Sequence, residues 1–145
     1  MKIRSILASK GSQVVTVRPQ VSATMAAEVM RTAGVGALVV VTGAEERIQG
    51  IIGERQIVAA VASGRGSIVD RCVADIMTVG GPTCSPDDDV KDVMALMTRS
   101  RSRHLPVVEG GRLAGVVSIG DMVKHRLDEI ELESRVVREA YQARR

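Results

Sequence analysis

Two kinds of hydrophobic pattern alternate along this chain. In the first, apolar side chains recur every three or four residues, and this spacing predicts a helix with one buried face. Such faces are formed by Met25, Ala26, Val29, Met30 and Ala33, and again by Val90, Val93, Met94 and Met97. We interpret the methionines on these faces as core-filling side chains rather than as a ligand-binding motif.

Each predicted helix is followed by two β-rich runs that are separated by a glycine-containing turn. The runs are Leu38–Val41 with Ile48–Ile52, and Leu105–Val108 with Leu113–Val117. Runs of β-branched residues on either side of a turn are typical of a β-hairpin. A second helix is predicted after each hairpin, beginning near residue 54 in the first case and near residue 120 in the second.

This order of elements indicates an internal duplication. Thr16 aligns with Thr83, and Pro19 with Pro86, at one constant offset, which shortens later because the first copy has the longer hairpin turn. Each copy has three strands and two helices, and alone it would leave an apolar sheet face exposed. We therefore predict a mixed α/β (α+β) fold of two β-α-β-β-α repeats with pseudo-twofold symmetry. Two equivalent clefts for small ligands would lie between the repeats.

The chain divides into residues 1–67, 68–126 and 127–145 on this alignment. The last segment has alternating spacings of three and four, with acidic residues first and basic residues last, which favours an amphipathic helix. Its apolar stripe follows Leu127, Ile130, Ser134, Val137 and Tyr141. About two heptads are too few for a stable free coiled coil, so we expect this helix to dock on its own body or on a second subunit.

The composition restricts the class of partner. The 145 residues are 45% hydrophobic and 26% charged, but they include no Trp, no Phe and one Tyr, so no aromatic platform can stack nucleic-acid bases. The net charge of +3 is too small to indicate a polyanion partner by itself. The longest apolar run is too short to cross a membrane and Met1–Lys10 lacks a signal-peptide core, so we expect a cytoplasmic protein without membrane contact.

Metal and catalytic chemistry have no recognisable pattern in the sequence. Cys72 and Cys84 lie outside any CxxC spacing, and we expect them to be reduced, buried residues. His104 and His125 are not at a ligand spacing with these cysteines, so we expect no metal site. The chain has no P-loop and no nucleophile paired with a base, and we predict that it is not an enzyme.

A candidate ligand site follows the last strand of the second copy, where Ser118 and Asp121 stand at the start of a helix. Backbone N–H groups and the helix dipole favour a phosphate there, and Asp121 can accept hydrogen bonds from ribose hydroxyls. The same spacing also fits a capping box in which both side chains serve only the backbone. Because the first copy has Gly53 and Gln56 instead, we expect unequal clefts, the better one being built around Ser118 and Asp121.

Basic residues precede the buried strand of the second copy. Arg103 and His104 stand where the first copy has Gly36 and Ala37. A guanidinium can grip phosphate oxygens in a fork geometry, so we hypothesise a phosphate clamp near the helix start described above. A solvated basic loop or a nucleic-acid contact remains the alternative, with contacts from Arg99, Arg101 and Arg103.

Taken together, these motifs resemble a tandem pair of CBS domains. The resemblance covers nearly the whole chain and rests on Arg103–Val108, Gly115–Asp121 and the lead-in segments Ile3–Leu7 and Val73–Met77. It implies a Bateman module that binds adenosine-containing ligands in its clefts, such as AMP, ADP, ATP, S-adenosylmethionine or a dinucleotide. It also implies a disc-like homodimer.

The resemblance places a nucleotide site in the second copy. Its residues are Thr83, Arg103, His104, Leu105, Pro106, Ser118 and Asp121. Asp121 would bind the ribose, and Ser118 would bind a phosphate together with the neighbouring cations. Thr83 would add a polar contact, and the backbone of Leu105 and Pro106 would face the base. In the first copy, weaker contacts would come from Thr16, Ala37 and Arg55.

We therefore predict a non-catalytic regulatory module that needs no cofactor, senses an adenine nucleotide in signal transduction and acts on an effector protein that the sequence does not identify. The alternatives are a dimerising scaffold without a ligand and a nucleic-acid or protein interaction module. Adenylate binding that weakens in Asp121→Ala would support the first reading. Salt-sensitive nucleic-acid binding that needs Arg99 and Arg101 would support the interaction module. A thermal midpoint unchanged by AMP, ATP or NAD would support the scaffold.

Overall fold

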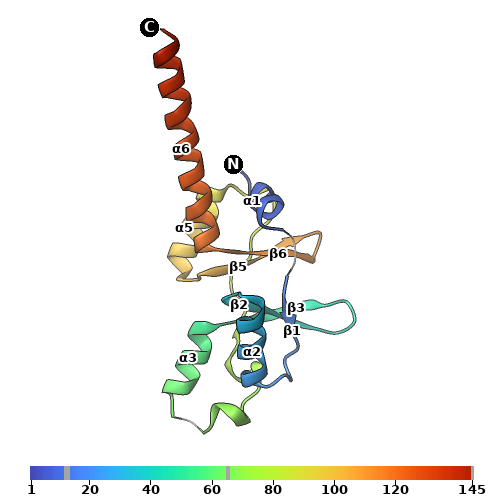
Figure 1. Ribbon diagram of the computed structural model, residues 1–145. Coiled ribbons are helices and arrows are strands. Elements are labelled where there is room, and N and C mark those ends of the chain that lie inside the picture. The colour runs from blue at the N-terminus through green and yellow to red at the C-terminus, as the bar shows by residue number, and fades with distance from the viewer. Residues whose placement is uncertain (12–13, 65, 145) are drawn as a thin grey trace.

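The chain folds into two similar halves stacked on one another, with one long helix projecting away from them (Figure 1). The computed structural model describes residues 1–11, 14–64 and 66–144. The first half contains β1 (Thr16–Val17), α2 (Ala23–Ala33), β2 (Ala37–Thr42), β3 (Arg47–Gly53) and α3 (Glu54–Ala62). The second contains α5 (Val90–Ser100), β5 (His104–Glu109), β6 (Arg112–Ser118) and α6 (Ile119–Ala143). The predicted mixed fold of two repeats is confirmed.

The strands form one sheet in each half. In the first sheet the order is β1-β2-β3-β4, where β4 (Thr78–Val79) comes from the segment that joins the halves, and only the β1–β2 pair is parallel. In the second sheet β5 and β6 form an antiparallel hairpin, and Cys84 adds an isolated parallel bridge at Val107. Both hairpins change register at the same place, between Val40 and Val41 and between Val107 and Val108. These matching irregularities support the duplication seen in the sequence.

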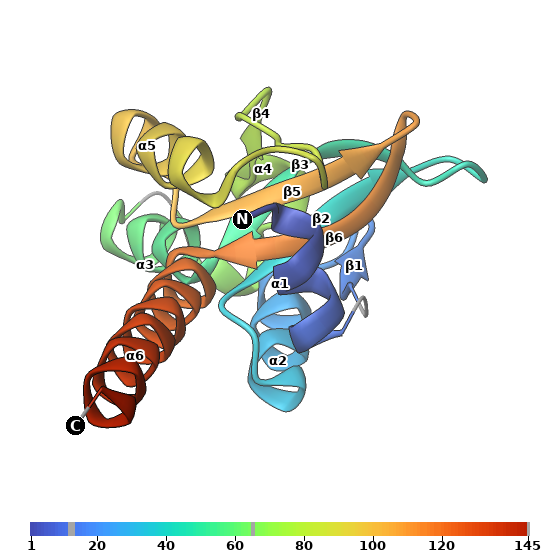
Figure 2. The same ribbon diagram turned by 90° about the horizontal axis from the view of Figure 1, so that it is seen from above.

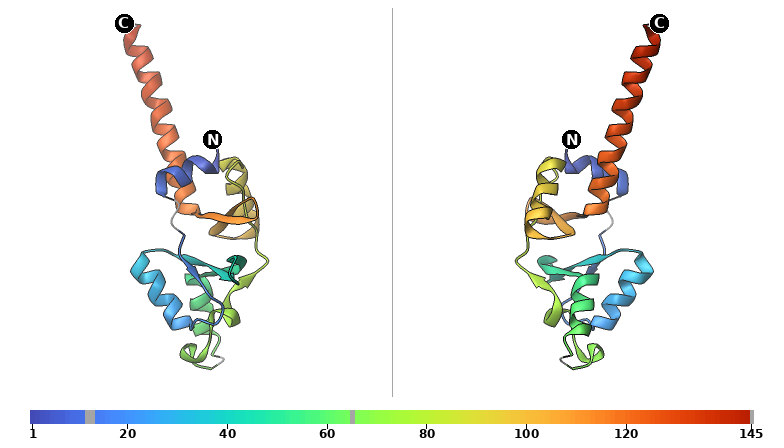
Figure 3. Two further views of the ribbon diagram at one scale, coloured as in Figure 1. Left: turned by 90° about the vertical axis from the view of Figure 1, so that its right-hand side faces the viewer. Right: turned by 90° about the vertical axis from the view of Figure 1, so that its left-hand side faces the viewer.

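The two sheets lie in the middle of the body, with helices outside them. Seen from above, β5 and β6 lie over β2 and β3 (Figure 2). Side views show α2 and α3 on the outer side of the first sheet and α5 on the outer side of the second (Figure 3).

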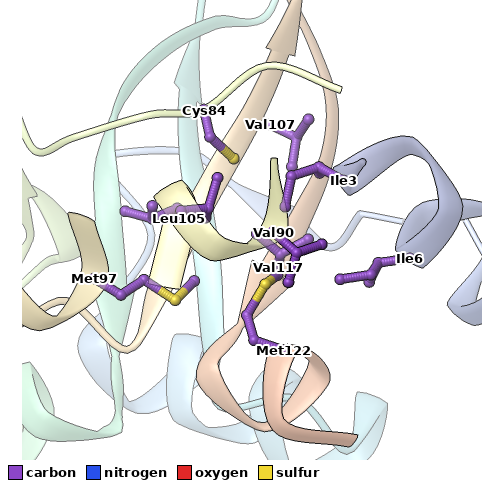
Figure 4. Close-up of a cluster of buried hydrophobic side chains, with 10 residues drawn as sticks. Ile3, Ile6, Cys84, Val90, Met97, Leu105, Val107, Val117 and Met122 are labelled. Atoms are coloured by element: carbon purple, nitrogen blue, oxygen red, sulfur yellow. The ribbon is translucent and has the colours of Figure 1, made fainter. Parts of the chain in front are cut away.

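Each lead-in segment packs into the half that belongs to the other copy. Ile3 and Ile6 of α1 (Ile3–Lys10) are buried beside Val90, Val107 and Met122 of the second half (Figure 4). In the first half, the corresponding residue is Val73 of α4 (Val73–Ile76), which follows a short 3-10 helix, η1 (Ile68–Asp70).

Matching hydrogen bonds fix both exchanged helices. The backbone N–H of Ile3 donates to the carbonyl of Asp88 at 3.0 Å, and that of Val73 donates to the carbonyl of Val21 at 2.8 Å. The packing units therefore differ from the linear segments 1–67 and 68–126. Residues 3–10 complete the second core, and residues 73–77 complete the first.

Both cores are aliphatic, as the lack of Trp and Phe requires. Met30 and Met97 are 4% and 1% exposed and fill the two cores, but Met25 is 54% exposed. The prediction for Met25 was wrong because the buried face of α2 is formed by Ala23, Ala26 and Met30, and Met25 lies to one side of it.

Both cysteines are free, Cys84 being buried and Cys72 partly exposed. Burial raises the pKa of the Cys84 thiol to about 12.

The C-terminal part differs from the expectation of two helices. A single helix, α6, runs without interruption from Ile119 to Ala143, and residue 145 lies outside the described residues. No glycine or proline occurs after Gly120 to end the first predicted helix, so nothing separates it from the second. Among the described residues, no helix combines the length and the apolar character that a membrane span requires.

Candidate functional site

A cleft of about 920 Å³ lies between the two halves. Strand residues contribute apolar surface to it, among them Ile51 of β3 and Pro106 and Val108 of β5. The other lining segments are the start of α3, the loop 100–103 that joins α5 to β5, and the segment 80–83. Each half therefore supplies part of the lining, and the cleft exists only because the two copies are packed together.

The cleft has a strong excess of positive charge. Its lining includes the arginines Arg47, Arg55, Arg101 and Arg103. Among the described lining residues, Glu54 is the only one with a carboxylate. The net charge of the whole chain is only +3, so this local excess is not a reflection of overall composition. A concave surface with several cations raises the local concentration of anions.

Arg55 connects the two halves across the cleft. It lies in the first turn of α3, and its Nη1 donates to the backbone carbonyl of Arg101 at 3.1 Å. Arg101 ends α5 in the left-handed conformation, with φ of 54°. The hydrogen bond thus links the helix start of the first half to the basic loop of the second.

Gln56 takes the position that corresponds to Asp121 in the second half. Its Oε1 accepts a hydrogen bond from the Gly53 N–H at 2.9 Å, and its Nε2 donates to Thr78 Oγ1 at 3.2 Å. An amide can do both because it is donor and acceptor at once. The replacement of a carboxylate by this neutral group leaves the arginines of the cleft with less negative charge nearby.

His104 lies at the point where the two halves meet. It is partly buried, and a Cβ placed on Gly36 would come within 3.2 Å of its imidazole ring. Burial lowers the pKa of His104, and the positive charges of Lys10 and Arg103 lower it further against the opposing effect of nearby carboxylates. The ring is therefore neutral near pH 7 and can donate one hydrogen bond and accept another.

Ser118 and Asp121 are absent from the described lining of this cleft and form a capping box. The Ser118 N–H donates to Asp121 Oδ2 at 2.8 Å, and the Asp121 N–H donates to Ser118 Oγ at 3.1 Å. Lys10 Nζ lies 2.6 Å from the same carboxylate oxygen and also donates to the carbonyl of Val116 at 2.9 Å. Any ribose that used this carboxylate would have to share it with Lys10 or displace it.

These contacts affect the charge state of Asp121. Burial alone would raise the pKa of its carboxyl, but the hydrogen bonds from Lys10 and from the Ser118 backbone outweigh it, and the pKa lies below the ordinary value. The carboxylate is thus charged at neutral pH and already partnered.

The residues predicted from sequence fall into two groups in space. Thr83, Arg103, His104 and Pro106 line the cleft, together with two residues that had been given a weaker role, Ala37 and Arg55. Leu105 is fully buried in the second core, and Thr16 in β1 is not among the described lining residues.

Sequence reasoning missed several lining residues, among them Arg47 and Gln56. It also assigned Arg101 only to a solvated basic loop or a nucleic-acid contact. The available signal was the glycine pair at 80–81, directly before Pro82 and Thr83, because Gly80 has a φ of 70°, which residues with a side chain rarely adopt. No described group of three His, Cys, Asp or Glu side chains is arranged to hold a metal ion.

Comparison with known proteins gives a consistent picture. The family model described as "CBS domain" matches residues 3–63 and 73–128. A 17.7 kDa protein of Acidianus ambivalens is 38% identical over 84% of this chain and 76% of its own length. The crystal structure of the CBS-domain-containing protein ATU1752 from Agrobacterium tumefaciens superposes with a TM-score of 0.82 at 40% identity. It covers 87% of this chain and 99% of that one.

A more distant structure contains ligands. The CBS domain pair of protein MJ0100, in complex with 5′-methylthioadenosine and S-adenosyl-L-methionine, superposes with a TM-score of 0.78. It covers 89% of this chain and 98% of that chain. Its identity to this chain is 23%, so the likeness extends to the fold alone.

Proposed function

This chain belongs to the CBS-domain family, and we propose that it binds an adenosine-containing ligand, such as AMP, ATP or NAD, in the cleft between its two CBS domains. The observation that carries the proposal is the meeting of Arg55, Arg101 and Arg103 beside aliphatic strand surface. Guanidinium groups bind phosphate oxygens in a fork geometry, and apolar surface suits a purine. The fold is known to hold adenosyl ligands in MJ0100.

The proposed ligand lies with its phosphates toward the arginines. The N-terminal turn of α3 adds a helix dipole of the favourable sign. Aliphatic side chains replace the aromatic platform that the chain lacks, and Ile51, Pro106 and Val108 contact the faces of the base. The neutral His104 ring and the Thr83 hydroxyl provide hydrogen bonds that carry no charge.

We propose that this binding is regulatory rather than catalytic. Arg55 comes from the first half, and Arg101 and Arg103 come from the second, so an anion between them contacts both halves at once. A ligand shifts a conformational equilibrium only through different affinities for the two states. Phosphate contacts to both halves supply such a difference, because they depend on how the halves are arranged. The shifted arrangement is what an effector protein would recognise.

The start of α6 is the second candidate position for a ligand. Ser118 would face a phosphate and Asp121 a ribose, as expected from the family pattern, with Arg103 and His104 near both positions. Lys10 separates the two candidates, because it is bonded to Asp121 and is not among the described lining residues of the cleft. Variants at Asp121 and at Arg55 therefore test the two positions independently.

Isothermal titration calorimetry with AMP, ATP and NAD tests the proposal. We expect Arg55→Ala and Arg103→Ala each to weaken binding of the preferred nucleotide by about tenfold or more, because each removes a charge-assisted contact. Arg99→Ala is the matched control. It removes an arginine of the same basic segment that is not among the described lining residues, and we expect unchanged affinity.

The other outcomes each contradict the proposal. Binding that weakens in Asp121→Ala but not in Arg55→Ala would move the ligand to the start of α6. Binding that weakens equally in Arg99→Ala and Arg103→Ala, and with added salt, would indicate a general polyanion surface. No heat and no thermal shift with any of the three nucleotides would favour a scaffold without a ligand.

A further inference from the structure

The projecting part of α6 carries an exposed apolar stripe. The stripe, called here the α6 seam, consists of Val123, Leu127, Ile130, Ser134, Val137 and Tyr141. Its spacings alternate between four and three residues, which is the a/d pattern of a coiled coil. All five of its hydrophobic members are 46% to 67% exposed. Figures 1 and 3 show that most of this helix extends beyond the two halves.

The α6 seam faces away from the protein's own body. The side of the helix that contacts the body includes Met122, which is fully buried, and the partly buried His125 and Glu129. At 100° per residue, Leu127 and Ile130 lie roughly opposite His125 on the helix. Docking of this seam on its own half is therefore excluded by the direction in which it points, and a second molecule has free access to it.

The charges beside the α6 seam specify what that second molecule is. One flank carries Glu133 and Arg126, whose Nη1 also lies 2.9 Å from Glu129 Oε2 of its own helix. The other flank carries Glu131 and Arg138. In a parallel, in-register pair of these helices, Arg126 of one copy faces Glu131 of the other, and Glu133 faces Arg138. Symmetry repeats both contacts, so every one of these flanking charges meets its opposite.

An antiparallel pair with the same overlap lacks this match. In that arrangement Glu131 would face Glu131 of the second copy, and Glu133 would face Glu133. An antiparallel shift by one heptad relieves the repulsion but reduces the number of apolar layers. Charge complementarity therefore selects a second copy of this same chain, in parallel orientation.

We propose that two copies of this protein associate through a parallel coiled coil of their α6 helices, formed by the α6 seam. The base of each helix is already fixed by Met122 in the second core, so the pair does not have to nucleate the helices. Ser134 places a polar group in the middle of the seam, which weakens the pair and penalises other registers. The homodimer expected from the family is thereby given a specific surface.

Sedimentation equilibrium on the full chain tests the surface with a matched pair of variants. Ile130→Asp places a charge in the α6 seam, and Leu132→Asp places the same charge on the same helix outside it. The exposed fractions of the two side chains are similar, 59% for Leu132 and 49% for Ile130. We expect a dimer whose dissociation constant rises about tenfold or more in Ile130→Asp and stays unchanged in Leu132→Asp. A monomeric wild type, or two variants with equal effects, would overturn the proposal.

Disulfide trapping tests the parallel direction. Leu127→Cys in a Cys72→Ser background places one reactive thiol in the α6 seam, because Cys84 is buried and its pKa is about 12. We expect a disulfide-linked dimer on mild oxidation. In the antiparallel pair the two thiols would be offset along the axis by about 15 Å and would not link. Trapping that fails while the wild type still dimerises would overturn the parallel arrangement.

The outcome is separable from that of the nucleotide proposal. The α6 seam contributes no residue to the cleft. Ile130→Asp should therefore bind nucleotide with the affinity of the wild type, and a failure of either proposal shows in its own measurement.

Discussion

At single positions, the two copies use the same backbone geometry for different chemistry. Asp121 and Gln56 both accept a hydrogen bond from the N–H that precedes their helix, at 2.8 and 2.9 Å. The carboxylate then attracts Lys10, whereas the amide reaches Thr78 and adds no negative charge beside the arginines of the cleft. In the sequence, Gln56 in place of a carboxylate looks like the loss of a ligand site. In the structure, the same replacement makes the adjacent cleft more cationic.

The lowered pKa of His104 predicts that acid destabilises the fold. Its pKa in the folded chain lies below the ordinary 6.5, so between the two values the unfolded chain binds more protons. The free energy of unfolding should therefore decrease as the pH falls below 6.5. His104→Gln keeps a hydrogen-bonding side chain without this titration, and we expect a flatter profile in urea unfolding above and below that pH. An unchanged slope in His104→Gln would contradict the prediction.

Asp121 acts in a separate and more acidic range. Its pKa lies below the ordinary 3.8, so its stabilising contribution is complete above that pH and is lost as the pH falls through the lower folded value. The His104 comparison is therefore made just below pH 6.5, well above the pH at which Asp121 titrates.

At the scale of elements, the exchanged lead-in helices determine how the protein unfolds. Each half contains a buried helix that the chain delivers from the other copy, α1 in the second core and α4 in the first. Neither core is complete without the helix that comes from the other copy. The two CBS domains should therefore unfold together in one cooperative transition.

Ile3→Ala measures this coupling. Ile3 is fully buried in the second core, and its truncation should lower the free energy of unfolding by about 2–4 kcal/mol while the transition remains single. Ser5→Ala is the control, since Ser5 is an exposed residue of the same helix. Urea unfolding followed by circular dichroism gives both values. Two separate transitions, or a loss no larger than that of the control, would show that α1 is not part of the core.

Local patterns predicted most of these elements but not their partners. The spacing of apolar residues identified α2, α5 and both hairpins, because it reports which face of an element is buried. The same spacing cannot report which core buries that face, so the exchange of α1 and α4 was not foreseen. The segment that forms α6 was predicted as two helices because the second repeat ends there. No glycine or proline stands at that point to end a helix.

At the scale of the whole molecule, the cleft depends on both copies at once. Sequence motifs predicted Thr83, Arg103 and His104 as site residues, and all three line the cleft. They did not reveal that the start of α3 stands opposite, because a motif describes the chain near itself and not the segment that faces it. Arg55 was consequently given a minor role, although it donates a hydrogen bond from the first half to the second.

The proposed dimer adds a level to this arrangement. Each copy would keep its own cleft between its own halves, while the α6 seam joins the copies at a distance from it. The proposed nucleotide binding and the proposed association would therefore use different surfaces.

A crystal structure of the full chain grown with AMP tests the central claim most directly. The account predicts the nucleotide in the cleft, with its phosphate between Arg55 and Arg103 and its base against Pro106 and Val108. Lys10 should remain bonded to Asp121. A nucleotide found instead at Ser118 and Asp121, with Lys10 displaced and the cleft without ligand density, would contradict it.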